Sequence, residues 1–125
     1  MDLSRAFLFA SGLLWLPYGV FCLAQPDFLR EAAGVAGQTP TGTTELRAMY
    51  GGLQAAIGLL SFAGAFRRDL QRTALVALAF LAGGLLSARV IGVLVDGGVS
   101  GYTVGALAIE STLTLLSIRL LRRAA

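Results

Sequence analysis

Four long apolar stretches occupy most of this chain, and they constrain its fold more than any other feature of the sequence. They lie at about residues 7–24, 45–66, 73–95 and 102–121, with a loop at 25–44. Each reaches the roughly 17–25 residues that a helix needs to cross the hydrocarbon core of a bilayer. The sequence therefore predicts an all-α integral membrane protein, in which residues 1–125 form a single four-helix transmembrane bundle.

The composition agrees with a membrane protein. The chain is 56% hydrophobic and only 14% charged, and its mean hydropathy is +0.75. Soluble domains average about 45–50% apolar and about 25% charged residues. A secretory signal peptide is a competing interpretation of the first stretch, with Cys22-Leu23-Ala24 as its cleavage site. The apolar run is long for the signal-peptide core of about 7–15 residues, and this favours a span.

The connections between the stretches carry turn signals. Pro26 to Ala33 predicts a short helix at the membrane interface that ends near Gly34, and Gln38 to Gly42 predicts a turn. Thr43 or Thr44 is then expected to cap the second span. Residues 67–72 are interpreted as a tight charged loop, and residues 96–101 as a turn.

The arginines predict the orientation. All ten basic residues are arginine. With four spans, one side of the membrane receives the residues Arg5, Arg67, Arg68, Arg72, Arg119, Arg122 and Arg123, whereas the other side receives only Arg30 outside the spans. The positive-inside rule then places both termini in the cytoplasm of a bacterium, with the bundle in the inner membrane.

Several kinds of chemistry are disfavoured. The chain has no histidine and one cysteine, Cys22. It therefore lacks the usual haem ligand and acid–base catalyst, and it cannot form an internal disulfide or a Cys-x-x-Cys redox pair. We expect no enzymatic activity, no cofactor and no metal site. The net charge of +3 comes from arginines at helix ends, not from a basic stripe interleaved with aromatic residues, so we expect no nucleic-acid partner.

Charged residues within apolar stretches are the strongest functional signal, because an ionisable group at membrane depth is costly. Counted from the predicted helix ends, Arg89 lies roughly 9 Å deep and Glu110 roughly 12 Å deep, both in the outer leaflet. Helical spacing gives Arg47, Tyr50 and Gln54 one face, and it gives Arg89 and Asp96 another. The predicted polar network or ligand site comprises Glu45, Arg47, Tyr50, Gln54, Arg89, Asp96 and Glu110.

Small residues at four-residue spacing form a second pattern. Gly52-x-x-x-Ala56 and Gly84-x-x-x-Ala88-x-x-x-Gly92 are of the kind that lets membrane helices approach closely. We interpret them as packing within one subunit. A dedicated dimer face is the alternative.

The string Thr44-Glu45-Leu46-Arg47-Ala48-Met49-Tyr50-Gly51-Gly52-Leu53-Gln54 resembles a small bacterial membrane family, domain of unknown function 4345. Arg89, Asp96-Gly97 and Glu110 resemble its pattern as well, and the likeness covers about residues 8–120. The resemblance implies four transmembrane helices and supports grouping the charged residues, but it implies no activity. The chain is also distantly similar to four-helix membrane proteins of the DoxX type.

Two interpretations of the charges stay open. Arg89 and Glu110 form either a structural ion pair, completed by Arg47 and Glu45, or part of a binding pocket. The leading hypothesis is a small binding or accessory protein, with an outer-leaflet pocket for the polar or anionic headgroup of a lipid, a quinone-like molecule or a small anion. The alternatives are a structural or assembly subunit of a larger membrane complex, and a minimal transporter that works as a homo-oligomer.

Overall fold

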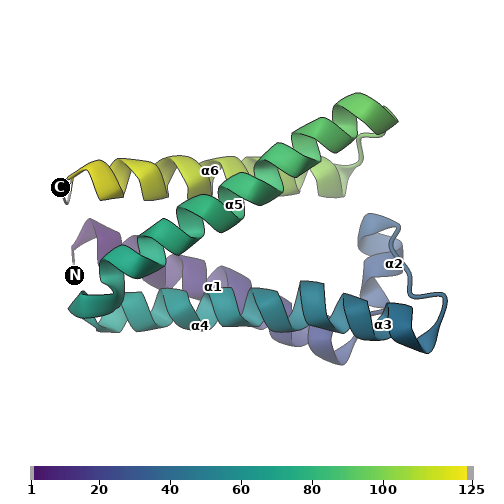
Figure 1. Cartoon of the computed structure of the whole chain (residues 1–125), viewed down its shortest axis with the longest axis horizontal. Coiled ribbons are helices and arrows are strands. Elements are labelled where there is room, and N and C mark those ends of the chain that lie inside the picture. Colours follow the sequence, from purple (N-terminus) through teal and green to yellow (C-terminus); the bar gives the residue numbers. More distant parts are fainter. Residues whose placement is uncertain (1, 124–125) are drawn as a thin grey trace.

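The computed structural model describes residues 2–123, and its regular structure is entirely helical (Figure 1). The elements in chain order are α1 (Leu3–Ala24), α2 (Phe28–Ala33), α3 (Pro40–Leu46), η1 (Arg47–Gly52, a π-helix), α4 (Leu53–Phe66), α5 (Arg68–Asp96) and α6 (Gly101–Arg123). Elements α3, η1 and α4 run on without a break. Counted as one, they join α1, α5 and α6 as the four helices among the described residues that are long and apolar enough to cross a membrane. The predicted all-α class with four candidate spans is confirmed.

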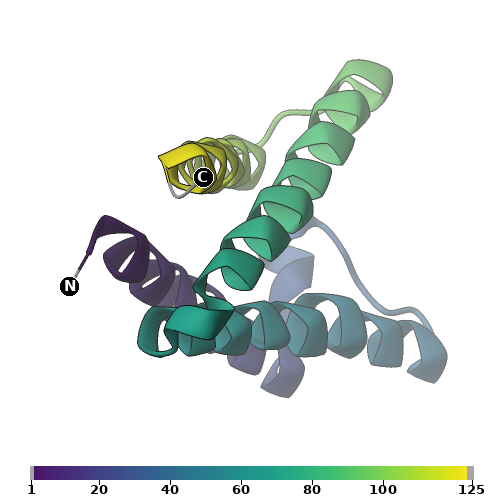
Figure 2. The ribbon, with the colours of Figure 1, turned by 60° about the vertical axis from the view of Figure 1, so that its left-hand side comes forward.

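The helices pack as two pairs. Helix α1 lies against η1 and α4, and α5 lies against α6. Figures 1 and 2 show α5 leaving α4 near the charged connection and diverging from the first pair along its length. We call the end that holds both described chain ends and Arg67 the terminal end. The opposite end, with α2 and the connection at residues 97–100, is the loop end.

Polar contacts join the elements at the terminal end. The Arg5 guanidinium donates from Nε to the carbonyl oxygen of Ala65 at 2.7 Å, which links α1 to the end of α4. The Gln71 amide donates to Asp2 at 3.2 Å, and the same carboxylate caps α1 by accepting from the backbone N–H of Arg5 at 2.9 Å. The two helix pairs are therefore fastened together at this end.

Glycines bring α1 and α4 together, but they are not the glycines that the sequence pattern singled out. A Cβ added at Gly58 would lie 2.4 Å from the backbone nitrogen of Leu16, and one at Gly19 would lie 2.3 Å from that of Ala55. At Gly84 a Cβ would meet nothing within 4 Å, and at Gly52 only a carbonyl oxygen at 3.9 Å. The expectation that the latter two mark packing within one subunit is wrong, because four-residue spacing cannot tell which helix face meets a neighbour in the same chain.

The second spanning helix begins earlier than predicted. Thr39 caps it by accepting from the backbone N–H of Gly42 at 3.1 Å, and Pro40 occupies the first turn. Proline suits this position because the first N–H groups of a helix have no partner within it. The residues interpreted as a turn are thus a helix start, and neither Thr43 nor Thr44 caps the helix.

The charged loop is also shorter than predicted. Only Arg67 separates α4 from α5, and it forms an exposed ion pair with Asp69 at 2.7 Å. Helix α5 has 29 residues, so it spans about 43 Å at 1.5 Å per residue, against a hydrocarbon core of about 30 Å. A helix of this length has to tilt or to extend beyond the membrane.

Helix α2 lies in the segment where the short interfacial helix was expected. It ends at Gly34, whose φ of 71° is left-handed and suits glycine. Leu29 of this helix is fully buried. The side chain therefore anchors α2 to the loop end of the bundle.

Candidate functional site

A cavity of about 750 Å³ lies between the two helix pairs, toward the loop end. All four spanning helices contribute to its walls, which are mostly apolar and include Leu14, Ile57 and Leu85. This volume falls within the range of about 300–1,000 Å³ that is usual for small-molecule sites. Figure 2 shows α5 diverging from α4 toward the loop end, and residues of α1 and α6 form the rest of the cavity wall.

One ion pair forms part of the wall. Arg89 of α5 donates to Glu110 of α6 from Nε, at 3.2 Å to Oε1 and 3.0 Å to Oε2, and from Nη2 at 2.7 Å to Oε1. The Glu110 side chain is only 4% exposed, and that of Arg89 is 26% exposed. A buried carboxylate needs such a partner because an isolated charge in an apolar medium is very costly. The two opposite charges cancel within the pair.

Two tyrosines continue the polar surface. The guanidinium of Arg89 lies 5.8 Å from the centre of the Tyr102 ring, within the range of a cation–π contact. The Tyr102 hydroxyl lies 3.0 Å from the hydroxyl of Tyr18 on α1. Since α1 and α6 do not otherwise pack closely along their lengths, this hydrogen bond is a direct tie between the two pairs at the loop end.

Two further polar groups in the cavity wall have no partner. Trp15 is 7% exposed and Gln54 is 9% exposed. Within residues 2–123, neither the indole Nε1 of Trp15 nor the amide Oε1 of Gln54 has a hydrogen-bond partner. The indole nitrogen can only donate, and the amide oxygen can only accept. Nearly all buried polar groups in proteins are satisfied, so these two atoms are exceptions on residues that line one cavity, although surrounding protein atoms cover both of them.

The π-helix η1 determines which residues face this cavity. A π turn holds more residues than an α turn, so the register of the helix slips across it. Met49 and Tyr50 of η1 line the cavity, as does Gln54 just beyond it. Arg47, at the start of η1, faces α1 instead. Its Nη1 donates to the carbonyl oxygens of Leu23 and Ala24, which are unsatisfied groups at the end of that helix.

A family model described as "Domain of unknown function (DUF4345)" matches residues 3–121. The chain belongs to the DUF4345 family. No curated protein and no solved structure matches it. The family assignment agrees with the resemblance seen in the sequence, and it carries no activity to this DUF4345 protein.

The structure brings together four of the seven predicted site residues. Tyr50, Gln54, Arg89 and Glu110 line the cavity of this DUF4345 protein. Glu45, Arg47 and Asp96 are not among its lining residues, and all three are exposed. The expected network in which Arg47 and Glu45 complete the Arg89–Glu110 pair is therefore replaced by a two-residue pair. The cause is the register slip in η1 and the position of Asp96 at the last turn of α5.

Sequence reasoning missed Trp15 and Tyr102 as site residues. Both are aromatic residues with a polar group, and such residues usually find a hydrogen-bond partner when they are buried. Trp15 is the only tryptophan in the chain, and it lies inside a span. That position in the sequence could have indicated Trp15, because the indole N–H of a tryptophan at membrane depth needs a hydrogen-bond acceptor.

Proposed function

We propose that this protein binds a membrane amphiphile with a small, uncharged polar group in the cavity between the helix pairs. The observation that carries the proposal is the pair of unpartnered buried groups, Trp15 Nε1 and Gln54 Oε1, in the cavity wall. A buried polar group left unsatisfied costs about 1–3 kcal/mol. A ligand that offers both an acceptor and a donor removes this cost once the two side chains turn these covered atoms toward the cavity, and its apolar body fits the remaining walls.

The ion pair favours an uncharged polar group over an anion. The two edge hydrogen-bond donors of Arg89, Nε and Nη2, are already directed at Glu110. An anionic headgroup could use only the remaining N–H groups of a guanidinium whose charge Glu110 already balances. The Arg89 guanidinium is accordingly a neutralised part of the cavity wall, and an anionic ligand has less support than an uncharged polar one.

The arginine distribution supports an orientation for the site. The terminal end carries Arg5, Arg67, Arg68, Arg72, Arg119, Arg122 and Arg123. By the positive-inside rule this end faces the cytoplasm, so the cavity opens toward the outer leaflet of a bacterial inner membrane. Arg89 lies seven residues before the end of α5, roughly 10 Å below it, which suits a small polar group better than a bulky headgroup.

A structural role in a larger membrane complex is the second candidate function. The fully paired Arg89 and Glu110 favour it, because a buried ion pair can serve to fix helix register. The unpartnered groups of Trp15 and Gln54 argue for ligand binding, since helix register requires no cavity. The two functions therefore differ in whether the purified protein retains a small molecule.

Native mass spectrometry of protein extracted in native lipid discs tests the proposal. We expect one neutral lipid retained per chain, lost in Gln54→Leu and kept in Gln38→Leu. Gln38 is the matched control because it is exposed and lies in a loop outside the cavity. Equal lipid retention by all three proteins would refute the proposal, and so would a wild type that carries no lipid. Isolation only with other subunits and no lipid would instead support the structural role.

A further inference from the structure

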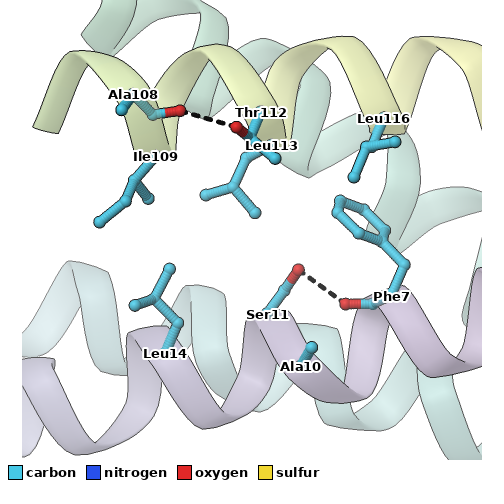
Figure 3. Close-up of a pocket in the computed structure, with 9 residues that line it drawn as sticks. All are labelled: Phe7, Ala10, Ser11, Leu14, Ala108, Ile109, Thr112, Leu113 and Leu116. Carbon is cyan, nitrogen blue, oxygen red and sulfur yellow. Dashed lines mark hydrogen bonds between the residues drawn. The ribbon is translucent and has the colours of Figure 1, made fainter. Parts of the chain in front are cut away.

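A second cavity continues the first. It has a volume of about 410 Å³ and lies between α1 and α6, as Figure 3 shows. Leu14 of α1 and Ile109 of α6 line both cavities and extend toward each other from the two helices. The two spaces therefore meet at this pair of side chains. From there the second cavity extends toward the terminal end, as far as Phe7 on α1 and Leu116 on α6.

The two cavities differ in polarity. Two residues in the wall of the second cavity have hydroxyl groups, and both donate to carbonyl oxygens of their own helices. Ser11 bonds to Phe7 at 2.9 Å, and Thr112 bonds to Ala108 at 2.8 Å (Figure 3). The rest of the wall is hydrocarbon. Every unpartnered polar group of the combined space thus belongs to the first cavity, and the second is suited only to an apolar occupant.

We propose that the joined cavities hold one molecule, a lipid with a single hydrocarbon chain and a small hydroxyl-bearing polar group. The inference rests on the proposed function and extends it to the shape of the ligand. The hydroxyl can accept from Trp15 and donate to Gln54, since it is both donor and acceptor. The hydrocarbon chain of the lipid passes between Leu14 and Ile109 into the second cavity, the groove between α1 and α6. A monoacylglycerol has this chemistry.

The dimensions and the direction of the combined space agree with such a ligand. From Trp15 to Phe7 helix α1 rises over eight residues, about 12 Å at 1.5 Å per residue. Trp15 and Gln54 lie near the middle of their spanning helices, and the apolar part runs from there toward the terminal end. A lipid bound in this way keeps the head-to-tail direction of the leaflet at the loop end, with its polar group drawn inward to the level of Trp15. The passage between two single side chains favours one chain over two.

The experiment uses a monoacylglycerol with a diazirine midway along its chain, mixed with the full-length protein in phosphatidylcholine vesicles. After irradiation, adducts are located by proteolysis and mass spectrometry. We expect labelling of Phe7–Leu14 and of residues 108–116 to exceed labelling of the lipid-exposed face of α5 around Ile91, which lines neither cavity, by roughly tenfold, equivalent to about 1.4 kcal/mol. Equal labelling of the groove and of the α5 face would overturn the inference.

Two variants sharpen this result. Ala108→Leu fills the groove from an exposed position and should remove most groove labelling, whereas Ala88→Leu, exposed on α5 and outside both cavities, should leave it unchanged. Unchanged labelling in Ala108→Leu would overturn the inference.

The Gln54→Leu variant separates this inference from the proposed function. If one ligand spans both cavities, Gln54→Leu loses groove labelling as well. If a retained lipid depends on Gln54 but the groove is labelled no more than the α5 face, the proposed function stands. The inference that the lipid's hydrocarbon chain lies in the groove is then refuted. If groove labelling depends on Ala108 but not on Gln54, the joint ligand is refuted and the groove binds a chain by itself.

Discussion

Arg89 and Glu110 form a bidentate ion pair in which Glu110 is buried and Arg89 is partly exposed. The carboxylate lies almost wholly inside the bundle, and the guanidinium reaches it from the cavity side. The contact joins α5 to α6 in the half of the bundle where the helix pairs diverge. It therefore stabilises one wall of the cavity without drawing α5 back toward α4.

Removing one member of this pair should destabilise the protein strongly. We expect Glu110→Gln to lower the free energy of unfolding by about 3–5 kcal/mol, because the Arg89 charge is left without its counter-ion. The double variant Arg89→Met with Glu110→Met should recover most of this loss, since similar side-chain volume is kept without a charge. Denaturant unfolding in bicelles measures both. A double variant as unstable as Glu110→Gln would contradict this account.

Close packing of α1 against α4 should make Gly58 intolerant of a side chain. A Cβ there would lie 2.4 Å from a backbone nitrogen of Leu16, so we expect Gly58→Ala to cost about 1–3 kcal/mol through overpacking. Gly84→Ala is the matched control, with open space around the added Cβ. It should be neutral or stabilising by up to about 1 kcal/mol, from helix propensity. Thermal unfolding in detergent compares the two, and equal losses would show that the packing is described wrongly.

The hydroxyl contact between Tyr18 and Tyr102 should couple α1 to α6. In a double-mutant cycle of Tyr18→Phe and Tyr102→Phe, we expect a coupling energy of about 0.5–1.5 kcal/mol, the usual net value of one hydrogen bond. Both substitutions keep the rings, so the contact of Tyr102 with Arg89 remains. Additive effects in unfolding measurements would show that the two hydroxyls act independently.

Arg47 should matter for stability and not for ligand retention. We expect Arg47→Met to lose about 1.5–3 kcal/mol, because the carbonyl oxygens of Leu23 and Ala24 lose a charged donor. Glu45→Gln, at an exposed position nearby, should change stability by no more than about 0.5 kcal/mol. Native mass spectrometry should show the same retained lipid in both variants. Loss of the lipid in folded Arg47→Met would return Arg47 to the binding site.

The cap of α1 should respond to acid. The backbone N–H of Arg5 lowers the pKa of Asp2 below its usual value, with a further contribution from the Gln71 amide. The unfolded chain then binds more protons than the folded one as pH falls through this range, so stability rises with pH there. The stabilising effect is present above the unfolded pKa of about 3.9 and is lost below it.

Asp2→Asn tests this dependence, because asparagine caps a helix about as well but does not titrate. We expect the melting temperature of the wild type to fall relative to that of Asp2→Asn as the pH is lowered from 5 to about 3. A difference between the two melting temperatures that stays constant over this range would show that Asp2 does not contribute through its charge.

The spans and the ion pair could be predicted from the sequence because each follows from a one-dimensional quantity. Apolar length indicates the spanning helices, and distance from the helix ends places Arg89 and Glu110 at similar depth. The position of Gln54 on an inward face followed from helical spacing alone. None of these inferences requires knowledge of which helices are neighbours.

The remainder of the site depends on three-dimensional facts. The face shared by Arg47 and Gln54 was predicted for a regular helix, and the π turn between them breaks that register. The reason to assign Trp15 to the site is that its indole N–H has no hydrogen-bond partner, and only the packed structure shows this. Gly58 and Gly84 look alike in the sequence, and only the pairing of α1 with α4 distinguishes them.

The π-helix η1 also has a consequence for the loss of residues. Deleting one residue from Arg47–Gly52 would allow this stretch to close into ordinary α turns. Such a deletion would leave Pro40–Leu46 and Arg47 at nearly their present rotation relative to α4, because a π stretch needs one residue more than an α stretch to turn through the same angle. A deletion elsewhere in this helix would instead rotate everything before it by about 100°. The stretch η1 is therefore the place where this spanning helix can lose one residue and still keep Arg47 at the end of α1.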